Sequence, residues 1–250
     1  MPAKLNVNID HVATVREARK TVEPSVLEAA RICEEAGAHG ITVHIRGDRR
    51  HIQDLDIEQL RDAVKSYLNV ELAASHEMVA FAEKVKPDAV SLVPEGPNEI
   101  TTEGGLDVLG NFETVKNAVQ KLKAAGIFVS IFIDPDTAQI DAAKNAGAEQ
   151  IELCTAEYAH MCVGTQAASL RASSPDTIDT EIERIRSAAV HAKNIGLIVA
   201  AGHGLTTENV KPLAAMPEIT EFNIGHHIIS RSIFVGLETA VKEMIAAIEG

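Results

Sequence analysis

The sequence predicts a single (β/α)8 barrel spanning residues 1–250, and three observations lead to this fold class. Short apolar, strand-like runs alternate with amphipathic helical runs from one end of the chain to the other. The alternation makes eight β-then-α units, and the 250 residues match the roughly 250 residues typical of such barrels. No linker rich in Pro, Gly or Ser divides the chain, so we expect one domain.

The expected strands are short and apolar, as strands are when both faces of a parallel sheet are buried. They cover residues 5–9, 40–45, 69–72, 89–93, 128–133, 150–153, 197–200 and 221–224. A doubly wound open sheet is the alternative, but it would call for a GxGxxG loop after the first strand. The residues found there, NIDHVATVREAR, contain no glycine, which favours the barrel.

The intervals between these strands contain amphipathic helical runs. Gly37, Gly126, Gly147 and Gly196 stand where a helix should end and a strand begin. Glycine at that position adopts the left-handed C-cap conformation without a Cβ penalty. The expected helices cover residues 24–37, 56–68, 75–85, 112–126, 136–147, 180–196, 207–216 and 234–250.

Two long segments interrupt this alternation. Residues 94–110, PEGPNEITTEGGLDVLG, are expected to form a loop after the fourth strand. Its polar residues and glycines are typical of a lid over an active site. Residues 155–179, rich in Ser, Thr and Ala, are expected to form a second long loop after the sixth strand. A solvated insertion is the alternative interpretation of both.

Composition excludes several classes of partner. The net charge of -13 and the absence of Trp argue against nucleic acid and anionic membranes. Cys33, Cys154 and Cys162 form no CxxC pair, which disfavours a disulfide framework and a structural zinc site. No apolar run has the length of a membrane span or the pattern of a signal peptide. We therefore expect a cytoplasmic protein.

Polar residues gather at the carboxyl ends of the expected strands, where barrels of this class build their active sites. Six of the ten histidines lie at these ends, namely His11, His44, His51, His203, His226 and His227. Histidines placed at random would not concentrate there. The other polar candidates at these ends are Asn8, Asp10, Arg46, Arg49, Glu71, Glu152 and Asn223.

Three of these residues carry the strongest functional interpretation. His44 and Glu71 lie within expected strands among apolar neighbours. A buried carboxyl group costs free energy unless it is paired or neutral, and burial raises its pKa toward values useful in proton transfer. His203 lies in IVAAGHGLTTENV between Gly202 and Gly204, which we interpret as clearance for a ligand beside the imidazole. A structural role is the alternative for each.

The sequence does not predict a metal centre or a covalent nucleophile. It has no HxH on a strand and no HExxH on a helix. The adjacent His226 and His227 point in different directions on any regular element. No lysine stands at the end of an expected strand, so a Schiff base is not expected. We interpret Cys154 as a packing residue, and we expect no cofactor.

Phosphate binding is predicted by the loops that follow the seventh and eighth strands, GHGLTT and NIGHH. Such loops in barrels bind phosphate through backbone N–H groups and a helix N-terminus. Gly204 and Gly225 let the backbone approach an anion, and Thr206 or Thr207 can cap the next helix. The first two loops supply a second positive group, Arg19, Arg46, Arg49 and His51. Two phosphorylated groups in one pocket are therefore expected.

These motifs resemble the pyridoxine 5'-phosphate synthase family. VNIDHVATVREAR, GITVHIRGDRRHI, NVELA, LVPE with ITTEGGLDV, IFID, AGHGLT and NIGHHII follow the family's order over nearly the whole chain. The resemblance implies a (β/α)8 barrel that assembles as a homo-octamer, a tetramer of dimers. It also implies condensation of 1-deoxy-D-xylulose 5-phosphate with 3-amino-2-oxopropyl phosphate. The products would be pyridoxine 5'-phosphate, phosphate and water in vitamin B6 biosynthesis, without metal or cofactor.

The resemblance also implies roles for individual residues. His44 and Glu71 match the proton acceptors, His203 the proton donor, and Glu152 a residue that stabilises the transition state. The residues matching the amino-ketone phosphate site are Asn8, Arg19, Gly204, Gly225 and His226. Those matching the deoxyxylulose phosphate site are Asp10, His11, Arg46, His51 and Thr101, and residues 101–105 resemble a lid. The sequence departs from the family at Cys154 and Ala156, where the family often has His and Gly.

Two other functions stay open from the residues alone. A phosphosugar epimerase or isomerase would share the phosphate loops but act on one substrate, so turnover of a pentose phosphate without an amine would identify it. A binding protein on a barrel scaffold would bind a ligand without forming a product. The buried His and Glu at the strand ends disfavour this last function.

Overall fold

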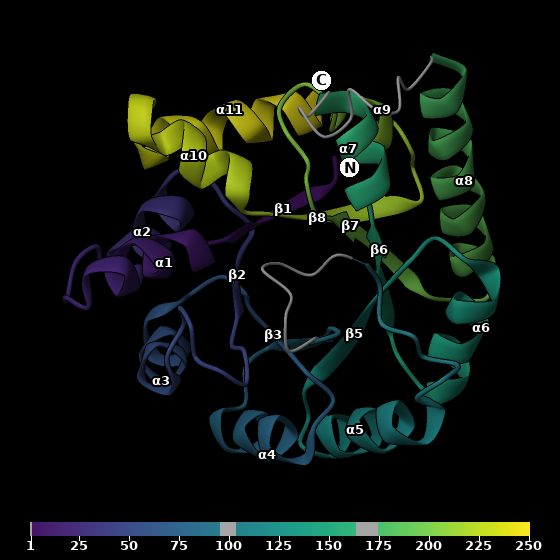
Figure 1. The fold of residues 1–250 in the computed structure, drawn as a ribbon, viewed down its shortest axis with the longest axis horizontal. Coiled ribbons are helices and arrows are strands. Elements are labelled where there is room, and N and C mark those ends of the chain that lie inside the picture. Colours follow the sequence, from purple (N-terminus) through teal and green to yellow (C-terminus); the bar gives the residue numbers. More distant parts are fainter. Residues whose placement is uncertain (1, 96–103, 164–174) are drawn as a thin grey trace.

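A closed barrel of parallel strands forms the centre of the computed structural model, which describes residues 2–95, 104–163 and 175–250 (Figure 1). Neighbouring strands pair in chain order, and β8 pairs with β1 to close the barrel. The strands are β1 (Lys4–Asn8), β2 (Gly40–His44), β3 (Leu68–Leu72), β4 (Ala89–Leu92), β5 (Phe128–Ile133), β6 (Gln150–Cys154), β7 (Ile198–Gly202) and β8 (Ile219–Ile224). The predicted (β/α)8 fold is confirmed.

Helices surround the barrel on its outside (Figure 1). They are α1 (Asp10–Arg19), α2 (Val26–Glu35), α3 (Asp54–Ala63), α4 (His76–Val85), α5 (Phe112–Ala124), α6 (Thr137–Ala146), α7 (Ala156–Val163), α8 (Pro175–Asn194), α9 (Lys211–Ala214), α10 (His226–Val235) and α11 (Leu237–Glu249). None of these described helices combines the length and the apolar composition that a membrane span requires.

The predicted strands are confirmed with ends that shift by one or two residues, whereas α1, α7 and α10 were not predicted. The pattern of α1 is weak because its buried side includes Arg16, whose guanidinium pairs with Asp56 at 2.7 Å. Helix α10 precedes α11, and Gly236 at φ +82° separates the two. The predicted helix over 207–216 is only the four-residue α9.

The prediction of a loop over residues 155–179 is wrong for its described parts. Helix α7 follows β6 almost directly, and α8 begins at Pro175. Tyr158 of α7 is buried, and its hydroxyl donates a hydrogen bond to the Asn209 carbonyl at 2.8 Å. This long-range anchor stabilises a helix that the local sequence pattern does not reveal.

An apolar core fills the space between the strands and the helices. One set of alternate strand residues supplies it, as in Leu5 and Val7 of β1 and Ile41 and Val43 of β2, all almost inaccessible to solvent. Each such side chain contributes about 1.5–3 kcal/mol through burial. The outer faces of the strands therefore hold the barrel and its helices together.

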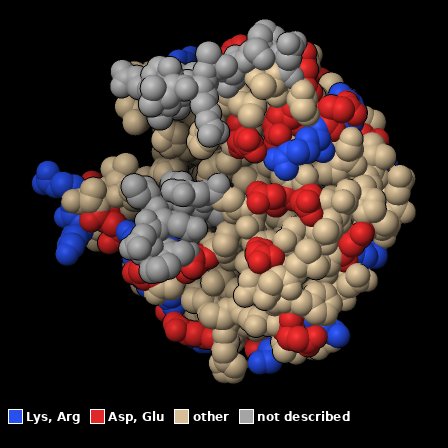
Figure 2. Space-filling model, turned by 45° about the vertical axis from the view of Figure 1, so that its right-hand side comes forward, with Lys and Arg blue, Asp and Glu red and all other residues tan. Residues whose placement is uncertain are grey.

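The other set of alternate strand residues is mostly polar, although barrel interiors usually hold branched apolar side chains. Hydrogen bonds between strands satisfy many of these groups. Ser91 donates to Asn69 at 3.1 Å, and Gln150 donates to Glu221 at 3.3 Å. The buried polar residues of the strands include Asn6, Thr42, His44, Asn69, Ser91, Ser130, Gln150, Glu152, Glu221 and Asn223. The outer surface drawn in Figure 2 carries many acidic side chains, in keeping with the net charge of -13.

Candidate active site

Three sequence-predicted residues meet at the carboxyl ends of β1, β2 and β3. His44 and Glu71 are register partners on β2 and β3. Asp10 lies beside them, so that one polar atom of each residue lies within 4.8 Å of the other two. Asp10 Oδ1 accepts a hydrogen bond from the His44 backbone N–H at 2.7 Å, and Oδ2 accepts one from Asn8 Nδ2 at 2.9 Å. Asn8 and Asp10 therefore brace the strand that carries His44.

The same three residues have the spacing of a possible metal site. Both Asp10 oxygens, however, already accept hydrogen bonds within the protein. Burial raises the pKa of Glu71 well above its ordinary value, and the nearby Glu152 and Asp10 carboxylates add to that shift. A carboxyl group whose pKa is raised binds a metal less readily, because it must first lose its proton, and once ionised it is a stronger base. The surroundings of these residues thus favour proton transfer.

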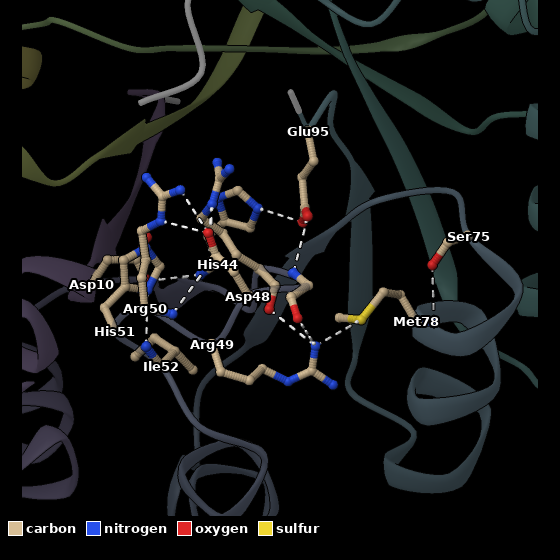
Figure 3. A network of polar contacts seen from close by, with 12 residues as sticks. Asp10, His44, Asp48, Arg49, Arg50, His51, Ile52, Ser75, Met78 and Glu95 are labelled. Atoms are coloured by element: carbon tan, nitrogen blue, oxygen red, sulfur yellow. Dashed lines mark hydrogen bonds and ion pairs between the residues drawn. The ribbon is translucent and has the colours of Figure 1, made fainter. Parts of the chain in front are cut away.

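Glu95 is a fourth residue of this cluster (Figure 3). Its Oε1 lies 3.2 Å from His44 Nε2, and its Oε2 accepts a hydrogen bond from the Gly47 N–H at 2.9 Å. Burial opposes ionisation of Glu95, but His44, the Gly47 N–H and Arg46 together lower its pKa below the ordinary value. Glu95 is thus a carboxylate that holds the His44 ring.

Glu152 lies in the polar interior of the barrel. Burial raises the pKa of Glu152 to about 8, although a hydrogen bond from Asn223 opposes this rise. Asn223 Nδ2 donates to Glu152 Oε2 at 2.6 Å, while Asn223 Oδ1 accepts from Asn6 at 3.2 Å and from Thr42 at 3.1 Å. The two donors at its oxygen fix the orientation of the amide, so its NH2 group must face Glu152.

His203 follows β7 in a backbone conformation that only a few per cent of non-glycine residues adopt, with φ of +81°. The buried Thr155 hydroxyl lies 2.8 Å from the Gly202 carbonyl oxygen and 2.7 Å from that of His203, and it donates to them. Burial lowers the pKa of the imidazole, and the neighbouring His160 and His226 add to this effect. His203 is therefore firmly held at the site, and its imidazole binds an added proton less tightly than a free imidazole does.

The glycines beside His203 make close contacts within the protein, while the predicted clearance for a ligand stays a prediction. A Cβ at position 202 would lie 2.2 Å from Glu152 Oε1. A Cβ at position 204, where φ is +76°, would lie 2.6 Å from Ala159 Cβ in α7. Gly202 thus lets Glu152 reach across β7, and Gly204 lets the loop pack against α7.

The predicted amino-ketone phosphate residues of β1 and β8 lie together. Gly225 contacts Asn8 so closely that a Cβ there would lie 2.8 Å from the Asn8 carbonyl oxygen. His226 begins α10, and its ring meets that of His11 edge to face at 5.0 Å. Burial lowers the pKa of His11. The positive end of α10 favours an anion at this position.

The remaining predicted residues divide between the site and the surface. The His51 ring lies 6.1 Å from that of His44, and Arg46 is buried beside Asp48. Arg49 instead turns outward to Asp54 at 2.7 Å. Arg19 is exposed at the end of α1.

Other predictions concern loop residues. Thr206 Oγ1 accepts hydrogen bonds from the N–H groups of Glu208 and Asn209 in a turn that precedes α9. The predicted cap by Thr206 or Thr207 is wrong, because the N-cap of α9 is Val210 and no side chain caps it. Cys154 packs with Val93, Phe132 and Ala156, in agreement with a packing role. Residues 96–103 of the expected lid, Thr101 among them, lie outside the described residues.

The sequence pattern did not indicate Glu95 or Thr155 for the site, and it indicated Asn223 as a polar candidate without a role. Asn223 carried a signal, because it alternates with Glu221 in a buried strand. Glu95 carried a weaker one, since it follows directly after the fourth expected strand and Pro94. Thr155 carried none, because its role depends on the backbone of β7.

Comparison with known proteins gives consistent matches. The family model described as "Pyridoxal phosphate biosynthesis protein PdxJ" matches residues 5–250. "Pyridoxine 5'-phosphate synthase" of Synechococcus sp. (strain JA-2-3B'a(2-13)) is 53% identical over 240 residues, covering 96% of each chain. The protein of the same name from Photobacterium profundum is 51% identical over 240 residues, covering 96% of this chain and 94% of that one.

Solved structures share the fold at much lower identity. Thiamine phosphate pyrophosphorylase from Pyrococcus furiosus superposes with a TM-score of 0.61 at 14% identity, covering 99% of this chain and 96% of that one. Phosphoribosyl anthranilate isomerase from Thermus thermophilus gives a TM-score of 0.59 at 14% identity, covering 98% of each. At such identity these structures support the barrel fold alone.

Proposed function

This chain belongs to the PdxJ family of pyridoxal phosphate biosynthesis proteins, and we infer that it is a pyridoxine 5'-phosphate synthase. It condenses 1-deoxy-D-xylulose 5-phosphate with 3-amino-2-oxopropyl phosphate, and it releases pyridoxine 5'-phosphate, phosphate and water. The observation that carries this inference is the family match over residues 5–250. The cluster of Asp10, His44 and Glu71 supplies the proton-transfer groups that such a reaction needs.

The reaction consists of proton transfers and eliminations. The amine of one substrate attacks the ketone of the other, and the resulting imine then loses protons, water and phosphate as the ring closes. His44 and Glu71 accept protons, His203 donates one to a leaving or reacting oxygen, and Glu152 stabilises the transition state. General acid–base groups of this kind contribute about 10²–10⁴-fold each. Holding the two substrates together supplies much of the remaining acceleration.

Two phosphate sites hold the substrates at the carboxyl ends of the strands in this single-domain barrel. The amino-ketone phosphate contacts Asn8, Gly204, Gly225 and His226, and we also propose Arg19, although its side chain is exposed at the end of α1. The deoxyxylulose phosphate contacts Asp10, His11, Arg46, His51 and Thr101. The contact between Gly225 and Asn8 and the start of α10 at His226 support the first site, and the loop over 94–110 acts as its lid.

The proposal extends to assembly and location. The chain forms a homo-octamer, and the exposed Ile233 and Phe234 of α10, 74% and 82% accessible, support contacts between copies. It acts in the cytoplasm, in keeping with three free cysteines. It needs no metal or organic cofactor, and it binds neither nucleic acid nor membranes.

The test is phosphate release with both substrates present, against each substrate alone, in the presence of a metal chelator. We expect release and a new pyridine absorbance only when both substrates are supplied. Conversion of the sugar phosphate alone would instead identify an isomerase or epimerase. No reaction under any condition would contradict the proposed function.

A further inference from the structure

We propose that Glu95 is a positioning residue that fixes the tautomer of His44, so that Nδ1 is the nitrogen that accepts a proton. The inference rests on the proposed function only in giving His44 the role of proton acceptor. The observations that carry it are the two contacts of the Glu95 carboxylate, to His44 Nε2 at 3.2 Å and to the Gly47 N–H at 2.9 Å (Figure 3).

The chemistry of the carboxylate determines where the His44 proton lies. An ionised carboxylate only accepts hydrogen bonds. The pKa of Glu95 is below its ordinary value, so the group is ionised at neutral pH. Its Oε1 therefore requires a donor at His44 Nε2, and a neutral imidazole has only one N–H. Nδ1 is then left with a lone pair.

The surroundings hold this arrangement in place. The side chains of His44 and Glu95 are 8% and 15% accessible, so water competes little for their contact. The Gly47 N–H anchors the second oxygen of Glu95, and the Asp10 carboxylate anchors the backbone N–H of His44. When Nδ1 takes a proton from the substrate, the carboxylate stabilises the imidazolium that forms.

The variant Glu95→Gln tests this inference because it keeps the shape and changes the pattern of donors. A glutamine offers one acceptor and one donor where the carboxylate offers two acceptors. If its oxygen accepts from the Gly47 N–H, its NH2 group faces His44 Nε2 and the imidazole proton must move to Nδ1. The opposite orientation would set two donors against each other at Gly47, which is unfavourable.

The tautomer can be read directly from the ring nitrogens of histidine by 15N NMR. The His44 signals are assigned by their loss in a His44→Gln variant. We expect wild-type His44 to carry its proton on Nε2, and the Glu95→Gln variant to carry it on Nδ1. A proton on Nδ1 in the wild type would overturn the inference, and that measurement needs no variant to fold. An unchanged tautomer in Glu95→Gln would overturn it as well.

Activity gives a second readout. Loss of the correct tautomer in a comparable histidine–carboxylate pair costs about 10⁴-fold in kcat, and loss of a group that orients a ligating histidine costs about 10–100-fold. We expect Glu95→Gln to lower kcat by at least about 10-fold and to change KM far less. In a His44→Gln background the same substitution should have little further effect. Unchanged kcat, or full additivity, would contradict the inference.

Glu34→Gln is the matched control. Glu34, like Glu95, has two polar partners, but both are backbone N–H groups, of Lys65 at 2.9 Å and Ser66 at 2.8 Å, and both bond to Oε1. These residues precede β3, at the end of the barrel opposite the site. The control should leave the His44 tautomer and kcat unchanged. If the wild type forms no product from the two substrates, the proposed function fails, while the NMR result still decides the tautomer.

Discussion

Glu95 at the rim of the barrel and Glu152 in its interior are the same residue type in opposite surroundings. Glu95 meets an imidazole, a backbone N–H and the charge of Arg46, and its pKa is lowered. Glu152 has one amide donor, and burial raises its pKa to about 8. The difference shows how one barrel assigns separate roles to its carboxyl groups. A well-paired carboxylate orients a neighbour, whereas a poorly paired carboxyl group can exchange a proton near neutral pH.

The largest effect is expected at Glu71. It shares the raised pKa of Glu152, and we propose that it accepts a proton during the reaction. Glu71→Gln keeps the volume and removes the proton-accepting group, so kcat should fall by about 10²–10⁴-fold. Steady-state kinetics with both substrates measure this effect. A variant that retains wild-type kcat would exclude Glu71 as a catalytic group.

The hydrogen bond from Asn223 lowers the pKa of Glu152, so the replacement of Asn223 tests whether hydrogen-bond donors set the pKa of these carboxyl groups. Asn223→Ala removes the amide donor to Glu152 and allows the pKa of Glu152 to rise further. The limb of the pH–rate profile that reports Glu152 should move to higher pH, and kcat should fall by about 10-fold. Asn69→Ala is the control, because Asn69 accepts from Ser91 in the same interior. An unmoved limb in Asn223→Ala would show that this hydrogen bond does not tune Glu152.

Thr155 holds His203 through hydrogen bonds to the backbone, whereas Glu95 contacts the side chain of His44. Thr155→Val removes the hydroxyl proton that the Gly202 and His203 carbonyl oxygens share. The Gly202 oxygen still accepts from the Thr155 N–H at 2.9 Å, so the free energy of unfolding should fall by about 0.5–1.5 kcal/mol, as for one lost hydrogen bond. The substitution should also lower kcat, because the backbone at His203 can relax from its positive φ. Thr155→Ser should restore most of both. Urea unfolding measures the free energy of unfolding of both variants, and steady-state kinetics measure their kcat. Equal losses in Thr155→Ser and Thr155→Val would contradict a role for the hydroxyl.

The raised pKa of Glu152 also predicts how stability depends on pH. A carboxyl group with a raised pKa binds its proton more tightly in the folded state. Its contribution is complete below about pH 4.5 and is lost as the pH rises through about 8. His51 and His203, with lowered pKa values, act in the opposite direction below about pH 6.5. Between about pH 6.5 and 8.5 the free energy of unfolding should therefore fall, and it should fall less in Glu152→Gln.

The smallest effect is expected where a carboxylate lies on the surface. Glu28 pairs with Arg31 on the surface of α2, where both side chains are more than half accessible. Exposed pairs of this kind contribute little to stability. Glu28→Gln should therefore leave the urea midpoint and kcat unchanged within error. A clear loss of stability would show that the surface carboxylate Glu28 matters as much as the buried ones, which would contradict the difference that we describe.

The sequence predicts the barrel better than it predicts the contacts within the site. Alternation and glycines such as Gly147 mark where strands begin, so the residues at the strand ends, His44 and Glu71 among them, follow from a local pattern. The partner of His44 does not, because Glu95 lies 51 positions away in a loop. Helix α7 was missed for the same reason, since the burial of Tyr158 depends on a distant carbonyl group.

Gly202 has a consequence for anyone who rebuilds this barrel. A side chain there would collide with the Glu152 carboxyl group at 2.2 Å, so positions 152 and 202 form one unit of design. In a library that randomises both, a larger residue at 202 would survive only with a shorter one at 152. If a glutamate is introduced into another barrel at the position of Glu152, the next strand needs a glycine at the position of Gly202. Gly202, which precedes His203 in the sequence, is thus required by Glu152 on the neighbouring strand.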